Sequence, residues 1–127
     1  MTSAPKPRPK YYDLNLAHLP AAGLVSIVHR GSGAALFLVL PVLLYLLQSS
    51  LASEGEFLRV KKYFDAPMVK LIALGFVWLY AHHFFAGIRY LFLDIHMGIS
   101  KEASRTSALA VFGAGVVATL AIGWGLW

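Results

Sequence analysis

Two adjacent histidines, His82 and His83, are the residues of this chain with the clearest capacity for chemistry. They stand in an otherwise apolar run that continues to Asp94. An ionisable side chain in an apolar helix is costly to bury without a partner, so it is a functional candidate by default. A neutral imidazole in such a place serves as a metal ligand, a proton relay or an interhelical hydrogen-bonding group. Neighbouring residues on a helix point about 100° apart, so we expect one site to use only one of these rings.

Helical spacing places the two histidines on different faces. His83 shares its face with Gly87 and Asp94, whereas His82 shares its face with Arg89. A flat macrocycle such as haem needs a gap in the helix surface beside its ligand, and Gly87 provides that gap one turn after His83. Haem ligation is therefore the favoured role of His83, with an interhelical hydrogen bond as the alternative. For His82 we favour packing, with one ring nitrogen bonded to a neighbour.

A second polar group, formed by Ser26, His29 and Arg30, lies near the start of the first long apolar run. At helical spacing these residues share a stripe with Gly33, which would let another helix approach closely. A hydroxyl, an imidazole and a guanidinium on one face favour a lined pocket, and the cations could hold haem propionates. The alternative is an interfacial stripe, in which Arg30 extends to lipid headgroups and His29 caps a loop carbonyl.

The composition indicates a membrane protein. Of the 127 residues 58% are hydrophobic and only 13% are charged, too little polar surface for a soluble domain of this size. The formal charge of +5 comes from basic residues at the ends of apolar runs, which is typical of membrane anchors and argues against nucleic acid. The chain has no cysteine, which excludes disulfides and iron–sulfur ligation by this chain.

The charge-free runs predict an all-α membrane protein with three transmembrane helices, forming part of a heteromeric helix bundle. No charge occurs between Arg30 and Glu54, between Lys70 and Arg89, or after Arg105. No cleaved signal peptide is expected. The predicted segments are an N-terminal arm and interfacial segment (1–20), a first helix (21–52), a periplasmic loop (53–66), a second helix (67–95), a cytoplasmic loop (96–104) and a third helix (105–127).

The distribution of basic residues favours a cytoplasmic N-terminus, because seven Lys and Arg side chains then lie inside against four outside. Three spans bring the start of the first helix and the end of the second to the same leaflet. We therefore expect the group around His29 to lie near His83. One face of the third span predicts a close-packing surface for another helix. Its small residues are Ser107, Ala110, Ala114, Ala118, Ala121 and Gly125.

Two motifs, together with the length and the three spans, carry a resemblance to a known family. The first is Ser26-x-x-His29-Arg30-x-x-Gly33, and the second is His83-x-x-x-Gly87-x-Arg89 followed by Asp94. Preceded by Arg8-Pro9 and His18-Leu19-Pro20, they resemble the cytochrome b membrane-anchor subunit of succinate dehydrogenase, respiratory complex II. The sequence departs from the common pattern at Tyr90, where a histidine is frequent, and at His82, where an aromatic residue is frequent.

The resemblance implies a role for each of five residues. His83 would be the axial ligand of haem b, whose second ligand comes from a companion anchor subunit. Ser26 and Arg30 would line the ubiquinone site, and His29 with Arg30 would approach the haem propionates. Asp94 would lie in the proton path to the quinone. No residue of this chain would be catalytic in succinate oxidation, which a partner subunit performs.

The expected function is that of an anchor that passes electrons from succinate to quinone in the tricarboxylic acid cycle and respiratory chain. Its implied partners are a second anchor subunit, an iron–sulfur subunit, a flavoprotein subunit, the lipid bilayer and quinone. The expected location is the bacterial cytoplasmic membrane, with the mitochondrial inner membrane disfavoured. Two alternatives are a haem-free structural anchor and a small proton-conducting protein that uses His82, His83 and Asp94.

Overall fold

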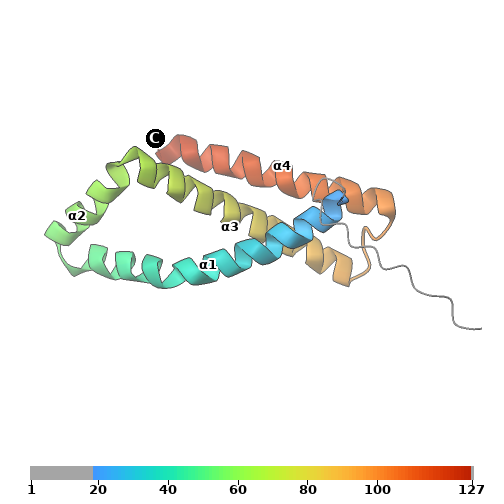
Figure 1. Ribbon diagram of the computed structural model, residues 1–127, viewed down its shortest axis with the longest axis horizontal. Helices are drawn as coiled ribbons and strands as arrows, with labels where there is room; N and C mark the ends of the chain where they lie inside the picture. The colour runs from blue at the N-terminus through green and yellow to red at the C-terminus, as the bar shows by residue number, and fades with distance from the viewer. Residues whose placement is uncertain (1–18, 127) are drawn as a thin grey trace, which may run out of the picture.

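Four helices make up the computed structural model, which describes residues 19–126 of the chain without the side chain of Leu126 (Figure 1). They are α1 (Ala21–Ala52), α2 (Glu54–Asp65), α3 (Pro67–Asp94) and α4 (Lys101–Leu126). Within this described part there is no strand. The helices α1, α3 and α4 are each long and apolar enough to cross a membrane. The all-α class with three candidate spans is therefore confirmed, while most of the expected arm lies outside the described residues.

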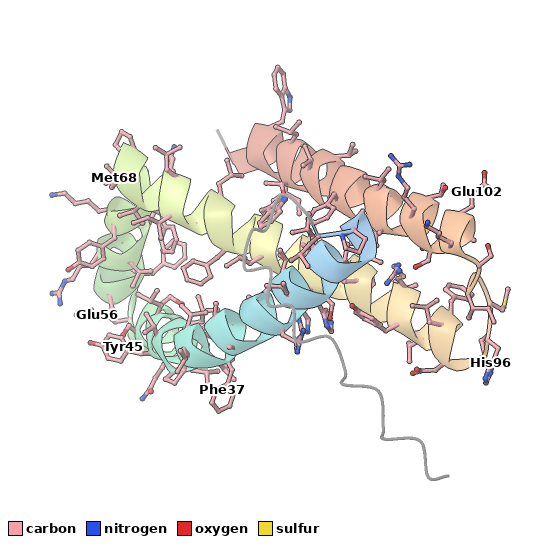
Figure 2. All side chains as sticks on the ribbon, turned by 45° about the vertical axis from the view of Figure 1, so that its right-hand side comes forward. Phe37, Tyr45, Glu56, Met68, His96 and Glu102 are labelled. Carbon is pink, nitrogen blue, oxygen red and sulfur yellow. The ribbon has the colours of Figure 1, made fainter. Side chains whose placement is uncertain are left out.

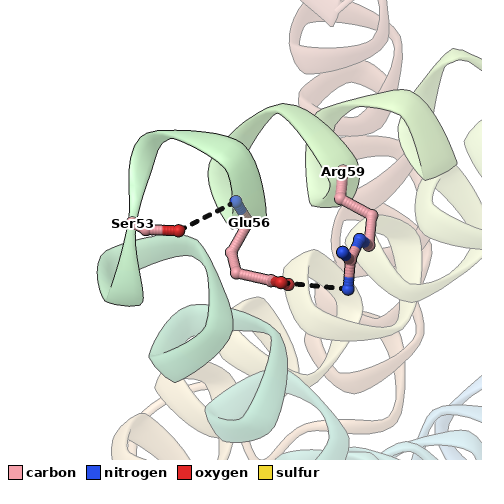
Figure 3. Close-up of polar contacts among 3 residues, drawn as sticks. All are labelled: Ser53, Glu56 and Arg59. Carbon is pink, nitrogen blue, oxygen red and sulfur yellow. Dashed lines mark hydrogen bonds and ion pairs between the residues drawn. The ribbon is translucent and has the colours of Figure 1, made fainter.

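The helix boundaries follow from local sequence. Pro20 and Pro67 stand at the starts of α1 and α3, where the missing N–H of proline is not needed. Residues 53–66, expected to be a charged loop, contain the helix α2. Ser53 caps α2, because its Oγ accepts a hydrogen bond of 3.2 Å from the backbone N–H of Glu56 (Figure 3). The carboxylate of Glu56 in turn pairs with Arg59 at 2.9 Å.

The long helices alternate in direction, so both polar groups of interest lie at one end of the molecule. The start of α1, the end of α3 and the start of α4 gather at this end, opposite α2 (Figure 1). The helices α3 and α4 pack side by side, whereas α1 crosses α3 and then diverges from it. The helix α2 bridges the resulting gap between the far ends of α1 and α3. The topology thus brings His29 and His83 together.

The outer surfaces of the helices are apolar. Large apolar side chains are exposed along α1, among them Phe37 and Tyr45, which project from the bundle (Figure 2). Charged and polar labelled residues lie toward the ends, with Glu56 at one end and His96 and Glu102 at the other. This distribution suits helices whose middles face lipid or partner helices and whose ends face water.

A tight turn joins α3 to α4. His96 adopts a left-handed conformation with φ of 62°, and Gly98 follows with φ of 73°. The N–H of His96 donates to the carbonyl of Leu93, and the N–H of Met97 donates to that of Phe92, both at 2.9 Å. These two bonds form a Schellman motif that satisfies the last carbonyls of α3.

The packing face of α4 differs from the one that the small residues predict. Ala121 and Gly125, at the end of the expected stripe, are exposed. The face buried against the rest of the chain instead contains Ala108, Val111, Gly115, Thr119 and Gly123. A Cβ on Gly115 would lie 3.6 Å from the Cα of His82, so the two backbones approach closely here. Contacts inside this chain therefore use a neighbouring face of α4, and packing of the small-residue stripe against a helix of another chain stays a prediction.

Candidate functional site

The imidazole of His83 is held by α1. Its Nδ1 lies 3.1 Å from the backbone carbonyl oxygen of His29 and 3.2 Å from the hydroxyl oxygen of Ser32. Ser32 itself donates to the same carbonyl at 2.9 Å. Because a carbonyl oxygen can only accept, these contacts favour the tautomer with the proton on Nδ1. Its Nε2 then carries the lone pair, and it has no hydrogen bond among the described residues.

Gly33 makes this contact between α1 and α3 possible, and Gly87 lies at the same contact with room for a Cβ. A Cβ added to Gly33 would lie only 2.9 Å from Cε1 of His83, closer than real Cβ contacts permit. A Cβ on Gly87 would lie 3.8 Å from Nε2 of His29. The ring of His29 stacks on that of His83, with centroids 4.2 Å apart and planes within 13°. The ring of Tyr90 lies beside His29 at 5.1 Å.

Ser26 and Arg30 form a separate pair on the more exposed side of α1. The Nη2 of Arg30 donates to the hydroxyl of Ser26, and its Nε donates to the backbone carbonyl of the same residue, both at 3.3 Å. The hydroxyl proton of Ser26 remains available, since the serine oxygen accepts in this pair. The expected stripe is thus divided: His29 and Gly33 face α3, while Arg30 is exposed.

The structure does not join Asp94 to either group. This residue is exposed at the end of α3, and within the described chain it forms no hydrogen bond or ion pair with Ser26 or Arg30. His29 and His83 are therefore the predicted site residues that the fold brings into direct contact, and Ser26 with Arg30 form the neighbouring pair.

His82 lies on a different face of α3 from His83 and is fully buried at the contact of α3 with α4. Its ring packs against Trp78 at 5.4 Å and against Phe112 at 5.0 Å. Neither ring nitrogen makes a hydrogen bond of good geometry in residues 19–126, although the backbone of Val25 lies close enough to interact. The predicted packing role is observed, but the expected well-formed hydrogen bond is not.

Arg89 is a further buried polar residue, and it ties α3 to α4. Its Nε donates to the hydroxyl of Ser107 at 3.0 Å, and its Nη2 donates to the hydroxyl and the carbonyl of Ser104 at 3.0 and 3.2 Å. Its guanidinium carbon also lies 5.5 Å from the ring centroid of Tyr90. Arg89 therefore links the α3–α4 contact to the aromatic cluster beside His29.

Comparison with known proteins identifies the family of this chain. The sequence model of the succinate dehydrogenase/fumarate reductase transmembrane subunit family matches residues 4–122. The chain belongs to this family. It is similar to the succinate dehydrogenase cytochrome b556 subunit of Coxiella burnetii, with 34% identity over 94% of this chain and 97% of that protein. The subunits of the same name from Paracoccus denitrificans and Rickettsia typhi are 29% and 27% identical, covering 87% and 89% of this chain. The matched regions make up 85% and 88% of the lengths of these two relatives.

Membership of this transmembrane subunit family raises the question of whether the residues present suit a haem. Metal-bound histidines usually donate their other ring N–H to a carbonyl or carboxylate, which orients the ring and makes the ligating nitrogen more basic. The contact of His83 with the carbonyl of His29 has this form. Within the described residues no three His, Asp or Glu side chains gather as a metal-ion site, but a haem needs one axial ligand from a chain. The donor set around His83 therefore fits.

Ser32 is the member of this site that sequence reasoning missed. Its side chain is buried and contacts Nδ1 of His83. The available signal was its position three residues after His29, where a serine hydroxyl bonds back to the helix carbonyl. Arg89 was placed on the face of His82 and in a motif, but no partner was predicted for it, because Ser104 and Ser107 lie on α4 and a pattern within one helix does not reveal them.

Proposed function

We propose that this chain is the haem b-binding membrane-anchor subunit of a succinate dehydrogenase and forms part of its quinone-reduction site. The observation that carries the proposal is the setting of His83. Its Nδ1 is directed to α1, it stands in the gap left by Gly33, and its Nε2 is without a partner in the described residues. Family membership and the name cytochrome b556 on similar proteins support the same assignment.

In this proposal α1 prepares His83 as an axial ligand. The carbonyl of His29 and the hydroxyl of Ser32 hold the tautomer and orientation, and the stacked ring of His29 restricts rotation. Haem b, when bound, supplies a one-electron store close to the quinone. His29 and Arg30 lie at the start of α1, where their side chains would meet propionates near the membrane surface.

Ser26 and Arg30 would bind the quinone. Arg30 donates to the oxygen of Ser26, which leaves the serine proton to donate to a quinone carbonyl. The guanidinium would stabilise the negative charge that develops on that oxygen during reduction. Reduction to the quinol consumes two protons, and exposed Asp94 at the same end of the molecule would help to deliver them from water.

Completion of the site requires other chains. A second anchor subunit would supply the other axial ligand, and an iron–sulfur subunit would deliver electrons from a flavoprotein that oxidises succinate. We place the chain in a bacterial inner membrane with its N-terminus in the cytoplasm, which agrees with the basic residues inside and with the bacterial relatives. In this orientation the pair of Ser26 with Arg30 and the contact of His29 with His83 lie on the cytoplasmic side of the membrane.

The decisive experiment compares two asparagine variants in the purified complex. Asparagine carries an amide nitrogen near the position of Nδ1 but has no counterpart of Nε2. His83→Asn should therefore keep the bond to α1 and lose the iron ligand, whereas His82→Asn is a matched neighbour on the opposite face. We expect His83→Asn to remove or strongly shift the reduced-minus-oxidised b band per flavin, and His82→Asn to retain it.

Two results would overturn the proposal. An unchanged b band in His83→Asn would exclude this residue as the ligand. A wild-type complex that contains all dehydrogenase subunits but no haem would favour the haem-free structural anchor. The quinone assignment has a separate readout: Ser26→Ala and Arg30→Lys should lower succinate–quinone activity while leaving succinate oxidation with a soluble acceptor unchanged.

A further inference from the structure

A groove of about 410 Å³ runs between the end of α3 and the first half of α4. It begins at the connecting loop beside Met97 and Gly98 and reaches Phe85 and Ala114 deeper in the bundle. The groove exists because the side chains of α4 that line it are small, and nearly all of its lining is apolar. No residue of α1 lines the groove, so it lies on a side of the hairpin that α1 does not cover.

Arg89 is the charged residue in this groove, and its charge is not neutralised by the described chain. Only 7% of its surface is exposed. Its Nε and Nη2 bind neutral oxygens of two serines, Nη1 has no hydrogen bond, and no carboxylate in residues 19–126 pairs with it. A buried cation is costly unless an anion or several strong acceptors accompany it. Residues 19–126 therefore supply no counter-charge to this site.

The depth of Arg89 indicates where that anion comes from. Arg89 precedes the end of α3 by five residues, which places it about 7.5 Å from the helix end at 1.5 Å per residue. With the end of α3 at the level of the lipid headgroups, this distance corresponds to the boundary between headgroups and hydrocarbon. The apolar wall continues beyond it by another turn, toward Phe85. A ligand with an anionic head at the interface and a hydrocarbon chain below it would match both the charge of Arg89 and the apolar wall of the groove.

We propose that this groove binds an anionic phospholipid, whose phosphodiester accepts hydrogen bonds from Arg89 and whose acyl chain lies between α3 and α4. A free phosphate would leave the apolar wall uncovered. A partner helix would cover the wall but would need a carboxylate at this depth to neutralise Arg89. Basic pockets between membrane helices are a known mode of headgroup recognition. The volume lies in the range of about 300–1,000 Å³ that is usual for small-molecule sites.

The test measures lipid retained by the intact purified complex. Phospholipids are extracted after detergent washing and quantified against flavin, and the delipidated complex is then returned to phosphatidylcholine vesicles with or without phosphatidylglycerol. Arg89→Gln removes the proposed headgroup contact. Arg105→Gln removes an exposed cation from the same end of the molecule and controls for general surface attraction. Ala114→Phe fills the groove but leaves the bonds of Arg89 to α4 untouched.

We expect wild type and Arg105→Gln to retain anionic phospholipid and to gain thermal stability from phosphatidylglycerol. Retention should fall about tenfold in Arg89→Gln, as expected for the loss of one charge-assisted interaction. Ala114→Phe should show a similar loss. If Arg89→Gln fails to assemble, Ala114→Phe decides the question. Wild-type retention in Ala114→Phe, a wild-type complex free of anionic lipid, or a partner carboxylate found against Arg89 would overturn the proposal. The haem spectrum is a separate readout, so failure here leaves the proposed function intact.

Discussion

Replacing Gly33 with alanine should displace the ring of His83 by steric contact, while the histidine itself stays unchanged. The new Cβ would stand 2.9 Å from Cε1 of the imidazole, whereas carbon atoms in contact prefer about 3.5 Å or more. The ring must therefore retreat by about 0.6 Å, or α1 must move away from α3. If the ring moves directly away from α1, the bonds from Nδ1 to His29 and Ser32, now 3.1 and 3.2 Å, would lengthen to about 3.7 and about 3.8 Å. At that length neither is a hydrogen bond.

The consequence should appear mainly in cofactor binding. Each lost bond is worth about 0.5–1.5 kcal/mol, and loss of a carbonyl that orients a ligand histidine typically lowers metal affinity by about 10–100-fold. Gly31→Ala is a matched control on the same helix, because no atom lies within 4 Å of its added Cβ. We expect Gly31→Ala to behave as wild type and Gly33→Ala to lose haem during purification.

The assay records the haem-to-flavin ratio and the b band of the purified complex after increasing detergent exposure. Ser32→Ala should give an intermediate result, since it removes one contact of Nδ1 and leaves the carbonyl of His29 in place. If Gly33→Ala and Gly31→Ala retain haem equally and have the same spectrum, then α1 does not hold the ring as described, and the reasoning from the glycine gap fails.

Three further predictions concern stability, each measured by thermal unfolding of the complex in detergent. Ser53→Ala removes the cap of α2 and should destabilise that helix by about 0.5–2 kcal/mol, with unchanged haem content; no shift would show that the cap is dispensable. Gly98→Ala forces alanine into a left-handed conformation and should cost about 1–2 kcal/mol, so a neutral result would contradict the turn geometry. Gly115→Ala should fit, because its Cβ makes ordinary contacts with His82, whereas Gly115→Leu should destabilise the α3–α4 contact by about 1–3 kcal/mol or more; equal stability of the two would refute close packing there.

The spans and their relative placement could be predicted from sequence because both depend on simple physical quantities. Charge-free length sets what can cross hydrocarbon, and alternation of direction sets which ends meet. The contact of His29 with His83 followed from these two considerations. The different faces of His82 and His83 followed from the angle between neighbouring helical residues.

The details that sequence could not supply are those that depend on how two helices rotate against each other. The small residues of α4 predicted one packing face, but the helix buries a neighbouring face that contains Val111 and Gly115. The partners of Arg89 on α4 are fixed by that same rotation. The helix in residues 53–66 was missed because the many charges of this segment were interpreted as a loop, and the capping role of Ser53 was not considered.

The unequal packing of α1 has a consequence for the order in which this protein matures. Only Val25 and Ser32 of α1 are buried, both in its first half, whereas α3 and α4 pack along their lengths. Although α1 is synthesised first, its start packs on the end of α3, so it cannot dock there until α3 has been inserted. The carbonyl that orients His83 arrives with α1. Under the proposed function, the histidine would therefore gain its orienting carbonyl only after α1 has docked, so an incomplete chain would hold haem more weakly.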